Sequence, residues 1–131
     1  MKELLANGGR RRFKSHNGLY LTYREKSWIQ RNELLVTRGT GEEEQKWTIE
    51  QINEKEVAIK SERGYYLGHK KNFDLAETRL HPNAWEMLTP VKNADGSWSF
   101  KSRWDKWLNG DSFGDFQAAN KESAHWWLEP Y

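Results

Sequence analysis

The chain has 131 residues, of which 36% are apolar, 31% charged and 14% aromatic, with eight tryptophans. This length predicts one domain, and the aromatic content argues against disorder, because disordered chains are poor in large aromatic side chains. The absence of cysteine excludes a disulfide framework, a thiol nucleophile and a thiolate metal site.

The net charge of +2 is unevenly distributed along the chain. Residues 1–40 carry nine Lys or Arg against three Glu, whereas residues 41–131 carry twelve against sixteen acidic residues. This asymmetry favours a basic face on the first third of the chain. The opening segment MKELLANGGRRR predicts at most one helical turn, over 2–6, and is too weakly apolar for a signal peptide. We expect a cytoplasmic protein without a membrane span.

The first predicted hairpin is KSHNGLYLTYR at 14–24, where Asn17-Gly18 is the turn and the residues on either side alternate between two faces. An insertion around YREKSWIQRNELLV follows it. Glu42, Glu43 and Glu44 then predict a solvated loop. The last strand of the unit should begin at Trp47, with Ile49 on the same face as Trp47.

The same pattern recurs twice, as KSERGYYLGHK at 60–70 and KSRWDKWLNGD at 101–111. Tryptophans follow the repeated serines at equal spacing, since Ser61–Trp85 and Ser102–Trp126 both span 24 residues, against 32 for Ser15–Trp47. We therefore predict Trp47, Trp85 and Trp126 as equivalent inward positions of three units.

Three β units of about 40 residues cannot each bury an apolar face alone, so they should close around a threefold axis. The predicted fold is an all-β β-trefoil with units at approximately 10–52, 53–92 and 93–131, six strands in a barrel and six in capping hairpins. Its core should contain two further layers, namely Phe13, Ile59 and Phe100, and Leu21, Leu67 and Leu108.

The motif of a basic residue, Ser, a Gly turn and an aromatic-Leu pair resembles the fascin-type trefoil repeat over roughly residues 11–131. VAIKSERGYYLG is a good match, whereas WSFKSRWDKWLN places Asp105 where the turn glycine belongs. The resemblance implies a binding module for actin filaments. Fascins string several trefoils together, whereas one trefoil is expected here.

A second resemblance is to ricin-type lectin trefoils, which close each unit with Gln-x-Trp. Gln45-Lys46-Trp47 satisfies this motif, whereas Asn83-Ala84-Trp85 and Ala124-His125-Trp126 match only at the tryptophan. This resemblance implies carbohydrate binding as the alternative function.

Catalytic signatures are missing from the sequence, which contains no nucleophile elbow, phosphate-binding glycine loop or His-Glu-x-x-His. The four histidines show no metal-like spacing. We expect a non-enzymatic protein without a cofactor or metal. No standard nucleic-acid signature is present, so nucleic acid is not an expected partner.

Two sets of candidate binding residues follow from these alternatives. An acidic protein surface such as an actin filament would contact the basic first unit, with Trp28 as a hydrophobic anchor, through Arg11, Arg12, Lys14, Arg24, Lys26 and Arg31. A shallow glycan site would combine ring stacking with hydrogen bonds, using Trp104, Trp127, Asp105 and Asn109. Partial burial under neighbouring loops is the alternative explanation for these outlying tryptophans.

Overall fold

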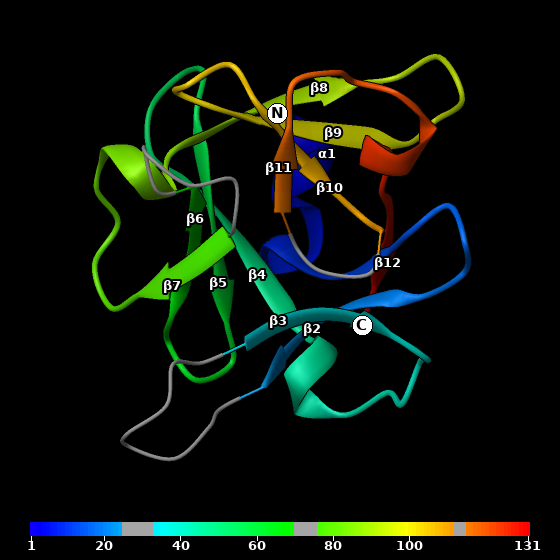
Figure 1. The fold of residues 1–131 in the computed structure, drawn as a ribbon. Helices are drawn as coiled ribbons and strands as arrows, with labels where there is room; N and C mark the ends of the chain where they lie inside the picture. The colour runs from blue at the N-terminus through cyan, green and yellow to red at the C-terminus, as the bar shows by residue number, and fades with distance from the viewer. Residues whose placement is uncertain (25–32, 70–75, 112–114) are drawn as a thin grey trace.

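The computed structural model describes residues 1–24, 33–69, 76–111 and 115–131 (Figure 1). A short helix, α1 (Lys2–Leu5), and a 3-10 turn, η1 (Ala6–Gly9), precede the strands. The first unit contains β1 (Arg10–Lys14), β2 (Tyr20–Arg24), β3 (Glu33–Thr37), η2 (Glu43–Gln45) and β4 (Trp47–Gln51). No helix within the described residues is long and apolar enough to cross a membrane.

The second and third units repeat this order of elements. The second contains β5 (Val57–Ser61), β6 (Tyr66–His69), β7 (Ala76–Arg79), η3 (Ala84–Glu86) and β8 (Leu88–Lys92). The third contains β9 (Trp98–Ser102), β10 (Trp107–Asn109), β11 (Asp115–Gln117), η4 (Glu122–Ala124) and β12 (Trp127–Pro130).

The strand pairing closes a barrel from the outer strands of each unit. The antiparallel pairs β4–β5, β8–β9 and β12–β1 join neighbouring units, and β1–β4 and β5–β8 close the first two units. A bridge between Trp98 and Trp126 closes the third. The inner strands form the hairpins β2–β3, β6–β7 and β10–β11. This architecture is a β-trefoil, as predicted.

The core consists of threefold-related apolar layers. Two of the predicted layers are fully buried, namely Phe13, Ile59 and Phe100, and Leu21, Leu67 and Leu108. Trp47 and Trp126 are also fully buried, and their indole N–H groups donate to the carbonyls of Leu21 and Leu108 at 3.0 and 3.1 Å. These hydrogen bonds satisfy polar groups that burial would otherwise leave unpaired.

The predicted third member of the tryptophan layer is wrong. Leu88, not Trp85, is fully buried and pairs with Val57, just as Trp47 pairs with Arg11 and Trp126 with Trp98. Trp85 lies within η3 and is only half-buried. Its spacing of 24 residues from Ser61 is therefore a coincidence, because the closing strand begins after the 3-10 turn in every unit.

The repeated serine stabilises the first turn of each unit. Its hydroxyl oxygen accepts hydrogen bonds from backbone amides in the turn, including those of Leu19 to Ser15 and Tyr65 to Ser61, both at 3.2 Å. The turn also needs a left-handed residue, which is Gly18 in the first unit (φ 77°) and Gly64 in the second (φ 85°). Asp105 adopts this conformation in the third unit, with φ 58°.

Candidate ligand-binding site

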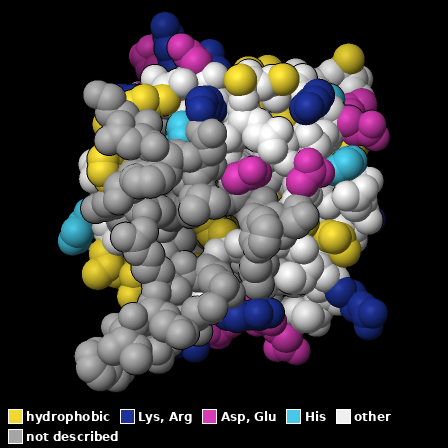
Figure 2. Space-filling view, in the orientation of Figure 1, with side chains coloured by type: hydrophobic (Ala, Val, Ile, Leu, Met, Phe, Trp, Pro, Cys, Tyr) yellow, Lys and Arg dark blue, Asp and Glu magenta, His cyan; other side chains and the backbone are white. Residues whose placement is uncertain are grey.

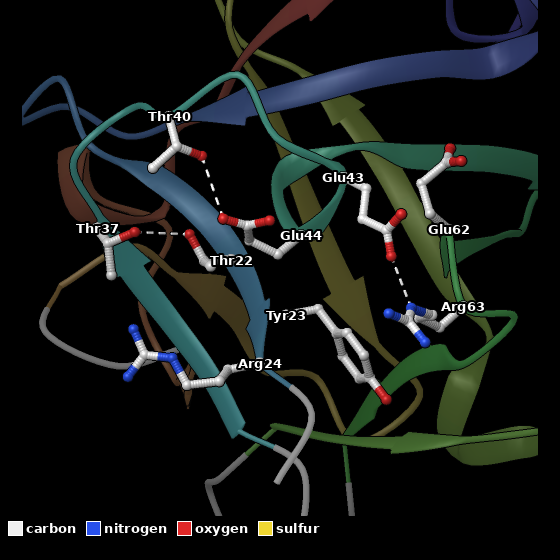
Figure 3. A pocket seen from close by; sticks show the side chains of 9 residues that line it. All are labelled: Thr22, Tyr23, Arg24, Thr37, Thr40, Glu43, Glu44, Glu62 and Arg63. Carbon is white, nitrogen blue, oxygen red and sulfur yellow. Dashed lines mark hydrogen bonds and ion pairs between the residues drawn. The ribbon is translucent and has the colours of Figure 1, made fainter.

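A cavity of about 400 Å³ lies where the β2–β3 hairpin, η2 and the β5–β6 turn meet (Figure 3). It therefore belongs mainly to the first unit, and the second unit contributes one wall. Its lining combines hydroxyl, carboxylate and guanidinium groups from Thr22, Tyr23, Arg24, Thr37, Thr40, Glu43, Glu44, Glu62 and Arg63.

Gln45, the first residue of the Gln-x-Trp motif, holds the inner part of this cavity together. Its side chain is fully buried, and its amide nitrogen lies 3.1 Å from the hydroxyl of Thr22 and 3.3 Å from that of Thr37. The same nitrogen donates to the carbonyl of Arg38, and the amide oxygen accepts from the backbone N–H of Thr40, both at 2.8 Å. A glutamine fits this position because it can donate and accept at the same time.

The two threonine hydroxyls form a pair on neighbouring strands. The Oγ1 atoms of Thr22 and Thr37 are 2.8 Å apart, and Thr22 also donates to the carbonyl of Tyr20 at 2.9 Å. Because β2 and β3 are paired in register next to these residues, the hydroxyl pair has a fixed orientation toward the cavity (Figure 3).

The aromatic side of the cavity is rigid and largely covered. Tyr23 is only 3% exposed, stacks on Tyr65 with 5.5 Å between ring centroids, and meets the edge of Trp47 at 6.5 Å. Its ring therefore supports the wall and presents little surface of its own to the cavity.

Three carboxylates and two guanidinium groups set the charge of the cavity. Arg63 Nε lies 2.6 Å from Glu43 Oε1, an ion pair that ties the second unit to η2. Glu44 accepts from the hydroxyl of Thr40 at 3.3 Å. Within the described part of the chain Glu44 has no ion-pair partner, so its carboxylate remains available to accept further hydrogen bonds.

Glu62 is positioned by the last residue of the chain. The hydroxyl of Tyr131 donates to Glu62 Oε1 at 2.8 Å, and its oxygen lies 3.3 Å from the carbonyl oxygen of Trp47. Partial burial, reinforced by the hydrogen bond to Glu62, raises the pKa of Tyr131 to about 12. The phenol is thus protonated over the physiological range, and Glu62 keeps its donor.

The described members of the predicted basic contact set have different environments. Arg11 is only 7% exposed and donates to the backbone carbonyls of Arg10 and Glu3 at 2.7 and 2.9 Å, so its guanidinium stabilises the fold.

The other described members are more accessible than Arg11. Arg12 and Lys14 are half-buried, and Arg24 lines the cavity. Among the described side chains on the face shown in Figure 2, Lys and Arg are interspersed with Asp and Glu. The predicted contacts Lys26, Trp28 and Arg31 lie outside the described residues.

The predicted stacking residues have different neighbours. Trp104 is half-buried, and its ring meets the edge of His69 of the second unit at 6.3 Å. Trp127 is half-buried next to Lys14 of the first unit. The partial burial of these two rings agrees with the alternative of packing under neighbouring segments.

The two polar residues predicted beside these rings have structural roles. Asp105 occupies the left-handed turn position and lies 3.8 Å from Lys101. Asn109 is fully buried, and its amide donates to the hydroxyl of Ser123 at 2.8 Å. These contacts make Asn109 part of the third-unit packing.

Most residues that line the cavity were not among the predicted site residues. The sequence predicts Glu43 and Glu44 in a solvated loop; both line the cavity from η2, and Glu43 remains exposed. The available signal was Gln45, because the first unit alone has a glutamine before its closing residue. No group of three or more His, Asp or Glu side chains within 1–24, 33–69, 76–111 and 115–131 is arranged to hold a metal ion.

Solved structures of other proteins share this fold. No protein-family model and no curated protein matches this sequence. The designed threefold-symmetric protein ThreeFoil has a TM-score of 0.79 at 13% identity, over 94% of this chain and 99% of that protein. SeviL bound to the asialo-GM1 saccharide has a TM-score of 0.78 at 14% identity, over 92% and 96%.

A larger protein contains a similar domain. A mosquitocidal holotoxin has a TM-score of 0.79 at 17% identity over 93% of this chain, which spans only 17% of the toxin chain. Identities this low establish a shared fold only. The three structures support the β-trefoil and do not support the fascin-type assignment.

Proposed function

We propose that this protein is a carbohydrate-binding module that holds a saccharide in the first-unit cavity. The observation that carries the proposal is the polar cavity organised by the buried side chain of Gln45, which fixes the hydroxyls of Thr22 and Thr37. A saccharide offers many hydroxyls that both donate and accept, and the cavity supplies carboxylate acceptors and a guanidinium donor around its rim. SeviL, a protein of the same fold, was solved with a bound saccharide.

The expected binding mode relies on hydrogen bonds more than on stacking. From η2, Glu44 would accept from sugar hydroxyls, and from the end of β2, Arg24 would donate to sugar oxygens. Hydrogen bonds to charged groups are about twice as strong as neutral ones. Because the proposed ligand is uncharged, affinity should change little with salt.

The fascin-type alternative, binding of an actin filament through the basic first unit, has weaker support. It draws on the charge of residues 1–40, yet Arg11 is buried and Arg24 lines the polar cavity. Filament binding of this kind would weaken with salt, because the screening length shortens from about 10 Å at 0.1 M to about 3 Å at 1 M.

The test is a glycan array followed by calorimetric titration of the strongest ligand. Glu44→Gln keeps the shape of the side chain but removes the charge, and we expect it to weaken saccharide binding about tenfold. Glu54→Gln is the matched control, since Glu54 is exposed outside the cavity. An array without ligands, combined with salt-sensitive co-sedimentation with filamentous actin, would reject the carbohydrate proposal and favour the fascin-type alternative.

A further inference from the structure

A second cavity, of about 500 Å³, lies between the β1–β2 turn and β12. It shares no lining residue with the first-unit cavity. Its walls contain a basic, an acidic and an aromatic side chain, and the lining consists of Lys14, Ser15, His16, Gly18, Trp127 and Glu129.

Trp127 is an exception to the threefold pattern. It lies opposite Lys14 in the pairing of β12 with β1. At the equivalent points of the other units, Thr48 lies opposite Lys60 and Thr89 opposite Lys101. Two of three units therefore use a threonine here, which shows that the fold has no need of a large aromatic ring at this position.

The environment of Trp127 differs from that of the core tryptophans. Trp47 and Trp126 are fully buried, and their indole N–H groups are bonded to backbone carbonyls. Trp127 is half-buried, and its N–H has no acceptor among the described residues. A partly exposed ring with an unused donor, on the wall of a cavity, is suited to ligand contact.

The polar groups of this cavity are held in place by Tyr20 and Asp111, which lie outside it, and by a contact between Lys14 and Glu129. Glu129 accepts from the hydroxyl of Tyr20 at 2.7 Å and lies 3.9 Å from Lys14 Nζ. The side chains of Lys14 and Glu129 are each 41% exposed, so both retain access to solvent. His16 is oriented by Asp111, with 3.2 Å between Nε2 and Oδ1. A donor and an acceptor thus flank the aromatic ring.

The second unit shows which part of this arrangement is scaffold. There Tyr66 donates to Glu50 at 2.7 Å, and Lys60 lies 3.9 Å from the same carboxylate. The Lys, Tyr and Glu triad is therefore a repeated element of the trefoil surface. What distinguishes the second cavity is the aromatic ring of Trp127 next to the triad, where the second unit has Thr48 at the equivalent position.

We propose that this cavity is a second saccharide-binding site. The apolar face of a pyranose ring would pack on Trp127, while Lys14 donates to, and Glu129 accepts from, the sugar hydroxyls. The choice of ligand class rests on the proposed function, but the site itself is separate. A module with two such sites binds a multivalent glycan surface more strongly than either site alone.

The test is an NMR titration of the ¹⁵N-labelled protein with the methyl glycosides of glucose, galactose and N-acetylglucosamine. We expect the indole signal of Trp127 and the amides of Lys14 and Glu129 to shift together. Trp127→Thr installs the residue of the other two units, so it should fold, and it should weaken binding at this site about tenfold. Trp107→Tyr is the matched control, because Tyr20 and Tyr66 occupy its equivalent positions and Trp107 lines neither cavity.

The two sites are distinguished by combining Trp127→Thr with Glu44→Gln. Shifts at the amides of Lys14 and Glu129 that persist in Glu44→Gln and vanish in Trp127→Thr support the second site, whether or not the first cavity responds. Saccharide-induced shifts confined to the first cavity, unchanged in Trp127→Thr, overturn the second site and leave the proposed function intact. If none of the three glycosides shifts either set of signals, the second site is overturned, and the proposed function then depends on the glycan array alone.

Discussion

The first and second units differ at two equivalent positions, one on the second strand of the unit and one in its 3-10 turn: the first unit has a cavity there, and the second unit is closely packed. In the first unit Thr22 lines an open cavity and accepts a hydrogen bond from the buried side chain of Gln45. In the second unit these positions are Gly68 and Glu86. A Cβ atom at Gly68 would lie 2.3 Å from the Glu86 carboxylate, so no side chain fits there. Glu86 instead accepts from the backbone N–H of Asn83 at 3.2 Å and caps η3.

The third unit fills the same place in another way. Asn109 stands at the position of Thr22 but is fully buried and bonded to Ser123, while Ala124 replaces Gln45. On the neighbouring strand, Phe116 stacks on His69 with 4.5 Å between ring centroids. The three units therefore hold very different pairs at these positions within the same fold. A polar cavity can form at these positions in one unit alone.

The largest effect should come from the closing position of the second unit. Leu88→Ala removes a fully buried side chain and should lower the free energy of unfolding by about 2–5 kcal/mol. Trp85→Ala removes a larger but half-buried side chain and should cost about 1 kcal/mol. Chemical denaturation measures both. If Trp85→Ala lowers the free energy of unfolding more than Leu88→Ala does, Trp85 contributes more to the core than Leu88.

A smaller effect is expected where the second unit has no room. Gly68→Ala places a Cβ against Glu86 and within 2.8 Å of the backbone carbonyl of Trp85, and it should destabilise the protein by about 1–3 kcal/mol. Gly64→Ala is the comparison variant, because it meets no atom within 4 Å and tests only the cost of its positive φ. Equal stability of Gly68→Ala and the unmodified protein in denaturant titrations would contradict the steric argument.

The smallest effect concerns the turn that the third unit builds without glycine. Asp105→Gly relieves the left-handed strain and should raise the free energy of unfolding by less than about 1 kcal/mol, since the glycine also gains entropy in the unfolded chain. The reciprocal change Gly64→Asp should lower it. Thermal unfolding of both variants measures the difference, and a stability loss in Asp105→Gly would show that the lost Lys101 ion pair and the added unfolded-state entropy together outweigh the strain.

The sequence alone determined the trefoil, because the features that specify it are local and repeated. Ser15, Ser61 and Ser102 mark turns that their own hydroxyls stabilise, and the alternation around Leu21 and its equivalents assigns the buried face of each strand. Because the same turn chemistry and the same alternation occur three times along the chain, they predict three similar units. The sequence also contained the single Gln45 that marks the unit with the polar cavity.

Tertiary structure decided the closing residue of the second unit and the composition of both cavities. The position of η3 relative to β8 placed Leu88 in the core, and equal spacing along the chain could not reveal that offset. Glu43 meets Arg63 across a unit boundary, and Trp127 meets Lys14 across the closure of the barrel. These contacts join residues 20 and more than 100 positions apart. Their chemistry emerges only when the three units pack, because no local pattern encodes which turn of one unit faces which strand of the next.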